Sequence, residues 1–149
     1  MHSFIQFLET YWGIMGAGIL PIARDTRKLL ISLRSESVNE PGTYGIIGGK
    51  VDHNFSQPSE EAKREFMEET GYSGSMHLIP AYIFKDNDFQ YHNFLGIIPK
   101  EFSPHLDEES SSMDWLTLDE LIKIEPKHFG LKALLSHSMP LIKKFTMSG

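Results

Sequence analysis

The feature that most constrains the fold is a helix signal near the middle of the chain. Pro58 suits the first position of a helix, and the residues that follow it, SEEAKREFMEET, contain no glycine or proline before Gly71. This run predicts one helix of about four turns that ends at Gly71. Short apolar and aromatic segments flank it on both sides, so the chain must combine helix with strand.

Runs rich in apolar, aromatic and branched residues predict strands on both sides of this helix: 13–23, 29–33, 43–47, 76–84 and 89–98. The first two are separated by a charged turn at 24–28 and predict a hairpin. The last two are separated by a polar turn at 85–88 and predict a second antiparallel pair. The strand at 43–47 leads into Gly48 and Gly49.

The C-terminal part predicts a loop and two further helices. Residues 107–112 are acidic and rich in serine, which is typical of a loop. A short helix is expected from Thr117, with Leu118 and Leu121 inward. The apolar spacing of 129–145 predicts a second helix, which Pro140 interrupts.

Strands before and after one central helix indicate a mixed sheet covered by helices on its faces. No internal repeat, low-complexity tract or long linker divides the 149 residues. We therefore expect one domain over residues 1–149.

Composition excludes several classes of function. The formal net charge of −6 argues against DNA binding through phosphate neutralisation, whereas a small anionic substrate is compatible if metal cations supply positive charge. The absence of cysteine excludes disulfides, thiolate metal sites and cysteine nucleophiles. The longest apolar stretch, 12–23, is too short to span a membrane, and the start of the chain lacks a secretory signal pattern. We expect a cytoplasmic protein that binds no membrane.

Acidic residues gather on one face of the predicted central helix. At about 100° per residue, four glutamates fall within an arc of roughly 100°: Glu61, Glu65, Glu68 and Glu69. Arg64 flanks this face, whereas Ala62 and Phe66 lie on another side that can pack on the sheet. Hard cations such as Mg²⁺ and Mn²⁺ prefer oxygen ligands. The alternative interpretation is a solvated charged surface, which spacing alone does not exclude.

The segment GGKVDHNFSQPSEEAKREFMEETGY, residues 48–72, resembles the Nudix box. That motif reads glycine, five residues, glutamate, seven residues, then Arg-Glu-aliphatic-any-Glu-Glu-any-Gly-aliphatic. Its second half matches in register at Arg64, Glu65, Glu68, Glu69 and Gly71. The first half departs from the motif, because Ser56 replaces the first glutamate and the loop after Gly49 carries one extra residue. We infer an altered loop and not a loss of catalysis.

The resemblance implies a fold and a metal site. The implied fold is an α/β/α sandwich with a mixed sheet between helices, and the implied cofactor is Mg²⁺ or Mn²⁺. The metal ligands would be Glu65, Glu68, Glu69 and the backbone carbonyl of Gly48 or Gly49. Arg64 would hold the glutamates in place through a salt bridge.

Many members of the family also use an acidic residue from a late loop as a metal ligand or general base. The matching position here is Glu109, and Glu108 is an equal alternative. Both residues are also compatible with an ordinary acidic surface loop. The resemblance leaves the general base open between Glu65 and Glu109.

Basic and aromatic residues near the box are candidates for contacts with the substrate. Arg34 and Lys50 are candidates for binding phosphates, although single basic residues beside turns are more often plain surface. Five aromatic residues after the box are candidates for stacking on a base, with core packing as the commoner role for any one of them: Tyr82, Phe84, Phe89, Tyr91 and Phe94. The scattered histidines, among them His53, His92 and His128, are interpreted as surface or turn residues and predict no zinc site.

The resemblance implies a metal-dependent hydrolase that cleaves the pyrophosphate bond of a small nucleoside diphosphate derivative, such as a nucleoside triphosphate or nucleotide conjugate. The alternative is a Nudix-fold module that senses a nucleotide without hydrolysing it. Loss of the first box glutamate allows this alternative, whereas the intact Arg-Glu and Glu-Glu pairs argue against it. Subfamily markers after the box are absent, so the substrate stays open. The resemblance also allows a homodimer, with the aromatic segment 2–12 as one packing surface.

Overall fold

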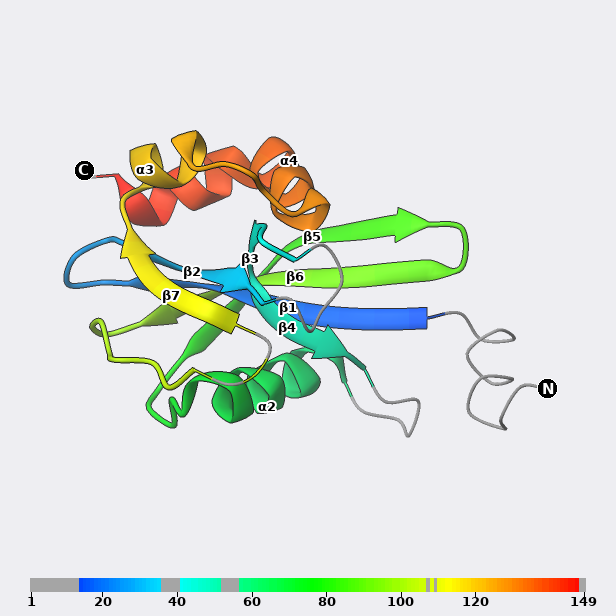
Figure 1. The fold of residues 1–149 in the computed structure, drawn as a ribbon, viewed down its shortest axis with the longest axis horizontal. Coiled ribbons are helices and arrows are strands. Elements are labelled where there is room, and N and C mark those ends of the chain that lie inside the picture. Colours follow the sequence, from blue (N-terminus) through cyan, green and yellow to red (C-terminus); the bar gives the residue numbers. More distant parts are fainter. Residues whose placement is uncertain (1–13, 36–40, 52–56, 107, 109, 148–149) are drawn as a thin grey trace.

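The computed structural model describes residues 14–35, 41–51, 57–106, 108 and 110–147 (Figure 1). The predictions made for His53, Ser56, Glu109 and the segment 2–12 lie outside these residues. The elements are β1 (Ile14–Ala23), β2 (Leu29–Arg34), β3 (Tyr44–Gly45), β4 (Ile47–Lys50), α2 (Pro58–Thr70), β5 (His77–Asp86), β6 (Phe89–Ile98), β7 (Ser110–Leu116), α3 (Leu118–Lys123) and α4 (Phe129–Thr146).

The strands of the described chain form one seven-stranded mixed sheet. Its main path runs β3-β2-β1-β6-β5, while β4 pairs with β1 and β7 pairs with β2. β1 and β6 are parallel, and the other pairs are antiparallel. Helix α2 covers one face of the sheet, and α3 and α4 lie over the other (Figure 1). The predicted sandwich with a mixed sheet between helices is confirmed.

Strand β1 has two partners in succession along one of its edges. Residues 16–19 pair with residues 47–50 of β4, and Ile22 further along pairs with Leu29 of β2. The other edge of β1 pairs with β6 over its whole length. The glycine-rich first half of β1 therefore lies between β4 and β6, which both contribute to the site described below.

Two apolar clusters cover the two faces of the sheet. On the α2 side, Ala62 and Phe66 of the helix are 0 % and 1 % exposed and pack with Ile19 and Leu30. This confirms the predicted apolar side of the helix, and burial of a side chain such as Phe66 contributes about 1.5–3 kcal/mol. On the α4 side, the buried cluster contains Leu20, Ile22, Leu95, Leu131, Leu134, Leu135 and Ile142.

The ends of the helices follow their local sequence signals. Helix α2 begins at Pro58 and ends at Gly71, whose φ of 77° is the left-handed conformation that glycine adopts without strain. Thr117 caps α3 through a capping box, because its side chain accepts from Glu120 N and the Glu120 side chain accepts from Thr117 N. Leu121 of α3 is fully buried, as predicted.

Two predictions about strands were wrong. Residues 110–112 were expected in a loop, but they belong to β7, which pairs antiparallel with β2. The serine-rich sequence gives no strand signal, and the partner that orders it is distant in the chain. The single strand predicted at 43–47 is divided at Ile46 into β3, which pairs with β2, and β4, which pairs with β1.

Two further predictions need correction. The break in α4 lies at Ser138, whose φ and ψ are −125° and 18°, and not at Pro140. Pro140 falls near the start of the continuing helix, where a missing N–H costs no hydrogen bond. His92 is not a surface or turn residue, because it lies within β6 and its Nε2 atom is buried. In the described part of the chain, no helix has the length and apolarity needed to cross a bilayer.

Candidate active site

Arg64 holds three carboxylates of α2 together. Its Nη2 atom lies 2.6 Å from Glu61 Oε2 and 3.2 Å from Glu65 Oε1, and its Nη1 atom lies 2.8 Å from Glu68 Oε1. The hydrogen bonds that Arg64 donates to Glu61 and then to Glu68 raise the pKa of Arg64 above its ordinary value. The i,i+3 and i,i+4 spacings place Glu61 and Glu68 next to the arginine on a helix, and Glu65 is its neighbour in the chain. One guanidinium therefore offsets part of the mutual repulsion of three glutamates.

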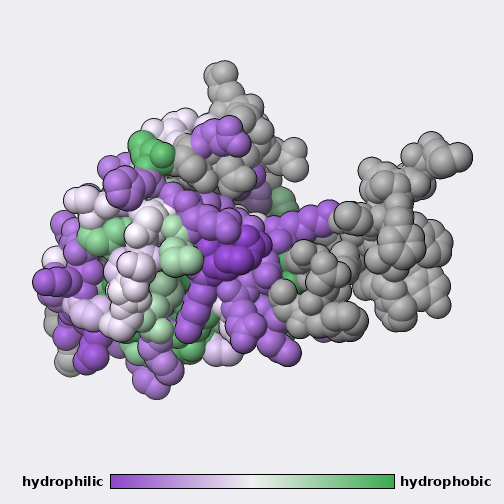
Figure 2. All heavy atoms as spheres, turned by 90° about the horizontal axis from the view of Figure 1, so that it is seen from below, coloured by the Kyte–Doolittle hydropathy of each residue, from purple (hydrophilic) through white to green (hydrophobic). Residues whose placement is uncertain are grey.

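The glutamates of α2 differ in their exposure. The side chains of Glu61 and Glu65 are 9 % and 22 % exposed, whereas that of Glu68 is 54 % exposed. Glu69 is 5 % exposed and turns inward. The view from the α2 side shows strongly hydrophilic side chains gathered in the middle of that face (Figure 2). The predicted acidic face therefore extends from a solvent-exposed rim to the protein interior.

Two consecutive glycines bring the backbone of β4 against α2. A Cβ atom added to Gly49 would lie 2.9 Å from Cδ and 3.0 Å from Oε2 of Glu65. A Cβ atom added to Gly48 would lie 2.3 Å from the carbonyl oxygen of Ala17. These positions have no room for a side chain, so the backbone of β4 lies directly beside the Glu65 carboxylate.

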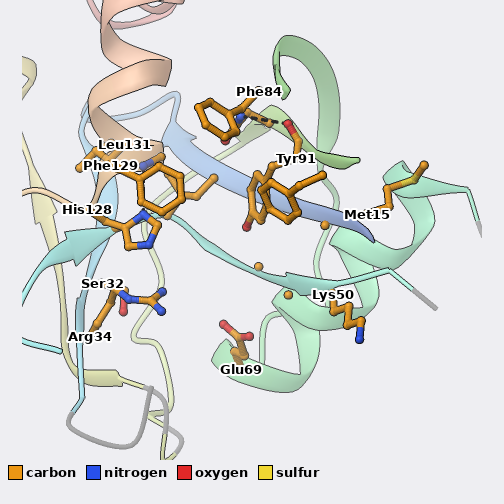
Figure 3. Close-up of a pocket in the computed structure, with 18 of the residues that line it drawn as sticks. Met15, Ser32, Arg34, Lys50, Glu69, Phe84, Tyr91, His128, Phe129 and Leu131 are labelled. Atoms are coloured by element: carbon orange, nitrogen blue, oxygen red, sulfur yellow. Dashed lines mark hydrogen bonds between the residues drawn. The ribbon is translucent and has the colours of Figure 1, made fainter. Parts of the chain in front are cut away.

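A cavity of about 580 Å³ opens beside these glycines. A volume in this range suits a ligand the size of a nucleotide. Figure 3 shows its two ends, with Phe84, Tyr91, His128 and Phe129 gathered at one and Arg34, Glu69 and Lys50 at the other. The cavity therefore combines an aromatic end with a charged end.

Tyr91 connects the two ends of the cavity. A Cβ atom added to Gly16 would lie 2.6 Å from the Tyr91 ring, and one added to Gly18 or Gly48 would lie 2.5 Å from the Tyr91 hydroxyl. The ring therefore packs on a surface made of glycine backbone from β1 and β4. This packing places the hydroxyl beside the strand that contacts Glu65.

The structure brings most of the predicted site residues to one place. The cavity is lined by Arg34, Gly48, Gly49, Lys50, Glu69 and Tyr91. Arg34 is partly buried and Lys50 is exposed at the cavity rim, so a phosphate-binding role for either stays a prediction. Glu65 contacts the edge of this region through Gly49, whereas Glu68 points to solvent and pairs with Arg64. Glu108 is exposed, and its backbone oxygen accepts a hydrogen bond from Ser35 Oγ at 2.5 Å.

The aromatic residues after the box divide into three groups. Phe84, Phe89 and Tyr91 line the cavity, so core packing was the wrong expectation for them. Phe94 is 7 % exposed and belongs to the core on the α2 side, as expected. Tyr82 stacks on His137 with ring centroids 4.2 Å apart.

Several cavity residues were not predicted from the sequence. His128 and Phe129 stand at the start of α4, where the His128 side chain accepts a hydrogen bond from Gly130 N. Ser32 and Ser110 are buried and join through their hydroxyls at 2.6 Å. Ser32 offered a signal, because it is a polar residue within the apolar strand β2, whereas the other three residues offered none.

Comparison with known proteins identifies the family. A family model for the NUDIX domain matches residues 14–137. The chain belongs to the Nudix family. No curated protein matches the chain in sequence.

Several solved structures share the Nudix fold of this chain. The Nudix hydrolase RenU from M. smegmatis has a TM-score of 0.72 at 15% identity, covering 92% of this chain and 89% of that one. The MutT protein from Methanosarcina mazei Go1 has a TM-score of 0.69 at 17% identity, covering 91% and 96%. The C. elegans Ap4A hydrolase has a TM-score of 0.65 at 18% identity, covering 89% and 99%. The likeness therefore extends over most of the chain, and at these identities it establishes the fold.

Nudix hydrolases generally use divalent metals, and the donors near Gly49 fit such an ion in their chemistry. Glu65 and Glu69 supply carboxylate oxygens, and the glycine backbone approaches them without an intervening side chain. Hard cations prefer this all-oxygen environment. Among the described residues, no three acidic or histidine side chains converge on one point.

Proposed function

We propose that this Nudix protein is a metal-dependent pyrophosphohydrolase of small nucleoside diphosphate derivatives. The observation that carries the proposal is the continuity between the carboxylates of α2 and a nucleotide-sized cavity. Glu69 reaches the charged end of this cavity, and Glu65 lies against the Gly49 backbone at its edge. A phosphoanhydride with an attached base requires such a division into charged and aromatic parts.

The proposal gives each charged residue a role. Arg34 and Lys50 line the cavity from β2 and β4 and bind phosphate oxygens. Glu65, Glu68 and Glu69, with a carbonyl of Gly48 or Gly49, hold Mg²⁺ or Mn²⁺. The bound ion supplies Lewis-acid polarisation of the phosphate and a more acidic water. Arg64 is a positioning residue, because it fixes Glu65 and Glu68 and does not line the cavity.

The general base is one of two glutamates. Glu65 lies beside the β4 backbone and can accept a proton from a water at the charged end. Glu109 remains the alternative from the late loop. The substitutions Glu65→Gln and Glu109→Gln separate them, because only loss of the base removes the acidic limb of the pH profile of kcat.

The test measures cleavage of a nucleotide panel with Mg²⁺ or Mn²⁺. The panel contains nucleoside triphosphates, oxidised nucleotides, ADP-ribose, dinucleoside polyphosphates and nucleotide sugars, and the products are separated by chromatography. Glu69→Gln should lower turnover by at least about a hundredfold, since it removes a group that acts on the transition state. Glu60→Gln is the matched control, because Glu60 lies exposed on the same helix and does not line the cavity.

The outcomes separate hydrolysis from sensing. Metal-dependent cleavage that Glu69→Gln removes and Glu60→Gln retains supports the hydrolase. Binding of a nucleotide without cleavage of any panel member refutes it and favours the sensor. In that case Ser56→Glu is the first variant to make, since it restores the first glutamate of the box.

A further inference from the structure

A buried amide lies in the cavity beside the aromatic rings. Asn93 of β6 is 2 % exposed and lines the cavity. It follows Tyr91 by two residues, so both side chains project from the same face of the strand. In the sheet it pairs with Gly18 of β1 and Tyr82 of β5. A polar side chain this deep in a protein normally has hydrogen bonds for all its polar atoms.

Only one half of this amide is satisfied within the described chain. Nδ2 of Asn93 donates to the backbone oxygens of Tyr82 at 3.1 Å and Tyr91 at 3.4 Å. Both partners are acceptors, so the amide must direct its NH₂ group toward them, and this fixes the position of Oδ1. No described residue donates a hydrogen bond to Oδ1, which is buried. A buried acceptor without a donor is costly to keep unless a ligand uses it.

The surroundings of Asn93 define the shape of the ligand group. The Phe84 ring lies 5.4 Å from the Phe129 ring and 6.2 Å from the Phe89 ring, measured between centroids. All three rings line the same cavity as Asn93. Aromatic walls select a flat ring, and a buried acceptor selects a group that carries an N–H.

We propose that Asn93 reads the base of the substrate by accepting a hydrogen bond from its amino group or ring N–H. This inference rests on the proposed function for the identity of the ligand as a nucleotide. Because Nδ2 is already engaged by two carbonyls, Asn93 acts as an acceptor and not as a donor. Because Asn93 lines the cavity, a ligand approaches Oδ1 from the cavity side when the side chains around that atom shift.

The experiment measures binding of nucleoside monophosphates by calorimetry. These ligands contain no phosphoanhydride, so their binding is independent of hydrolysis. AMP, CMP, GMP and UMP are compared, and the tightest is paired with an analogue that lacks the N–H donor. The analogue replaces the amino group of AMP or CMP by hydrogen, methylates the ring N–H of UMP, or, for GMP, methylates the ring N–H and replaces the amino group by hydrogen. We expect the analogue to bind at least about tenfold more weakly.

The variant Asn93→Leu tests whether this preference depends on the amide. It should weaken binding of the natural nucleotide about tenfold and reduce the ratio between nucleotide and analogue to near one. A purely structural role would weaken both ligands equally and leave that ratio unchanged. Gln90→Leu, which removes an amide from the opposite face of the same strand, should keep the ratio of the unmodified protein.

Three results would overturn the proposal. These are equal affinity for the natural nucleotide and its analogue in the unmodified protein, an unchanged ratio in Asn93→Leu, and no binding of any monophosphate. The first comparison needs no variant, so it stands even if Asn93→Leu does not fold. A protein that binds monophosphates with this preference but cleaves no panel member would retain the base site while losing the proposed hydrolase activity.

Discussion

The two adjacent glycines of β4 allow a sharp separation of stability from activity. Gly48→Ala and Gly49→Ala make the same chemical change at neighbouring positions. The methyl group at residue 48 would lie 2.3 Å from the Ala17 carbonyl oxygen and 2.5 Å from the Gly18 Cα atom. The three atoms nearest to the methyl group at residue 49 would all belong to the end of the Glu65 side chain, with Cδ at 2.9 Å. One clash is with rigid backbone and the other with a side chain that can rotate.

These distances set the expected magnitudes. To restore a separation of 3.0 Å, Gly48→Ala must move β4 from β1 by 0.7 Å, across a segment where four residue pairs are in register. Overpacking costs about 1–3 kcal/mol and a weakened hydrogen bond about 1 kcal/mol, against a gain of about 0.5–1 kcal/mol from replacing glycine. We expect Gly48→Ala to lose about 2–3 kcal/mol of unfolding free energy. Gly49→Ala should lose less than about 1 kcal/mol but displace the Glu65 carboxylate, which lowers kcat about a hundredfold.

Urea unfolding followed by tryptophan fluorescence measures the first quantity, and kcat at saturating metal measures the second. Each variant is compared with the unmodified protein at the same pH and ionic strength. The reasoning fails if Gly48→Ala unfolds within about 0.5 kcal/mol of the unmodified protein. It also fails if Gly49→Ala loses as much unfolding free energy as Gly48→Ala, since that would mean that the Glu65 side chain cannot rotate away from the added methyl group.

Two further predictions concern stability. Thr117→Ala removes the capping box of α3 and should lower the unfolding free energy by about 0.5–2 kcal/mol in urea, whereas Thr117→Ser should retain most of it. Burial, and then the charge of Lys85, lower the pKa of His92 below 6.5 in the folded state. Folding favours the neutral form of His92, and this contribution to the unfolding free energy is fully present above pH 6.5. It is lost as the pH falls through the folded pKa of His92, so the urea midpoint should decline as the pH falls below 6.5. His92→Leu should flatten that decline, and an unchanged profile would contradict the assignment.

The parts of the fold that depend on local signals were predictable from the sequence. Pro58 and Gly71 mark the ends of α2 because one fixes φ for the first turn and the other adopts a left-handed conformation. Thr117 likewise marks the start of α3 through its own side chain. The richness of residues 76–84 and 89–98 in aromatic and branched side chains likewise predicted β5 and β6 from local sequence.

The parts that depend on distant partners were not predictable. The strand at 110–112 is ordered by pairing with β2, and the division at Ile46 arises because β3 and β4 have different neighbours. Neither cause is visible in the local residues. The Nudix box indicated the carboxylates of α2. Only the folded structure shows that Glu65 pairs with Arg64 and that Glu69 lines the cavity.

The aromatic end of the site shows the same limit. Period-two alternation indicates that residues 89, 91 and 93 share a face, but not which face borders the cavity. Phe129 becomes a cavity residue only because α4 packs over β5, next to Phe84. Asn93 was detectable in principle as a polar residue in an apolar strand, but its half-satisfied amide emerges only from the hydrogen bonds of the sheet.

The packing of Tyr91 on Gly16, Gly18 and Gly48 also limits how this chain can evolve. The ring fills the space that side chains at those three positions would need, so none of them can gain a methyl group while the tyrosine stays in place. A smaller residue at position 91 would remove that restriction at Gly16, although Gly48 would still be limited by the β1 backbone. A descendant with a smaller residue in place of Tyr91 is therefore expected to acquire larger residues in β1. Those changes would leave the carboxylates of α2 unaltered.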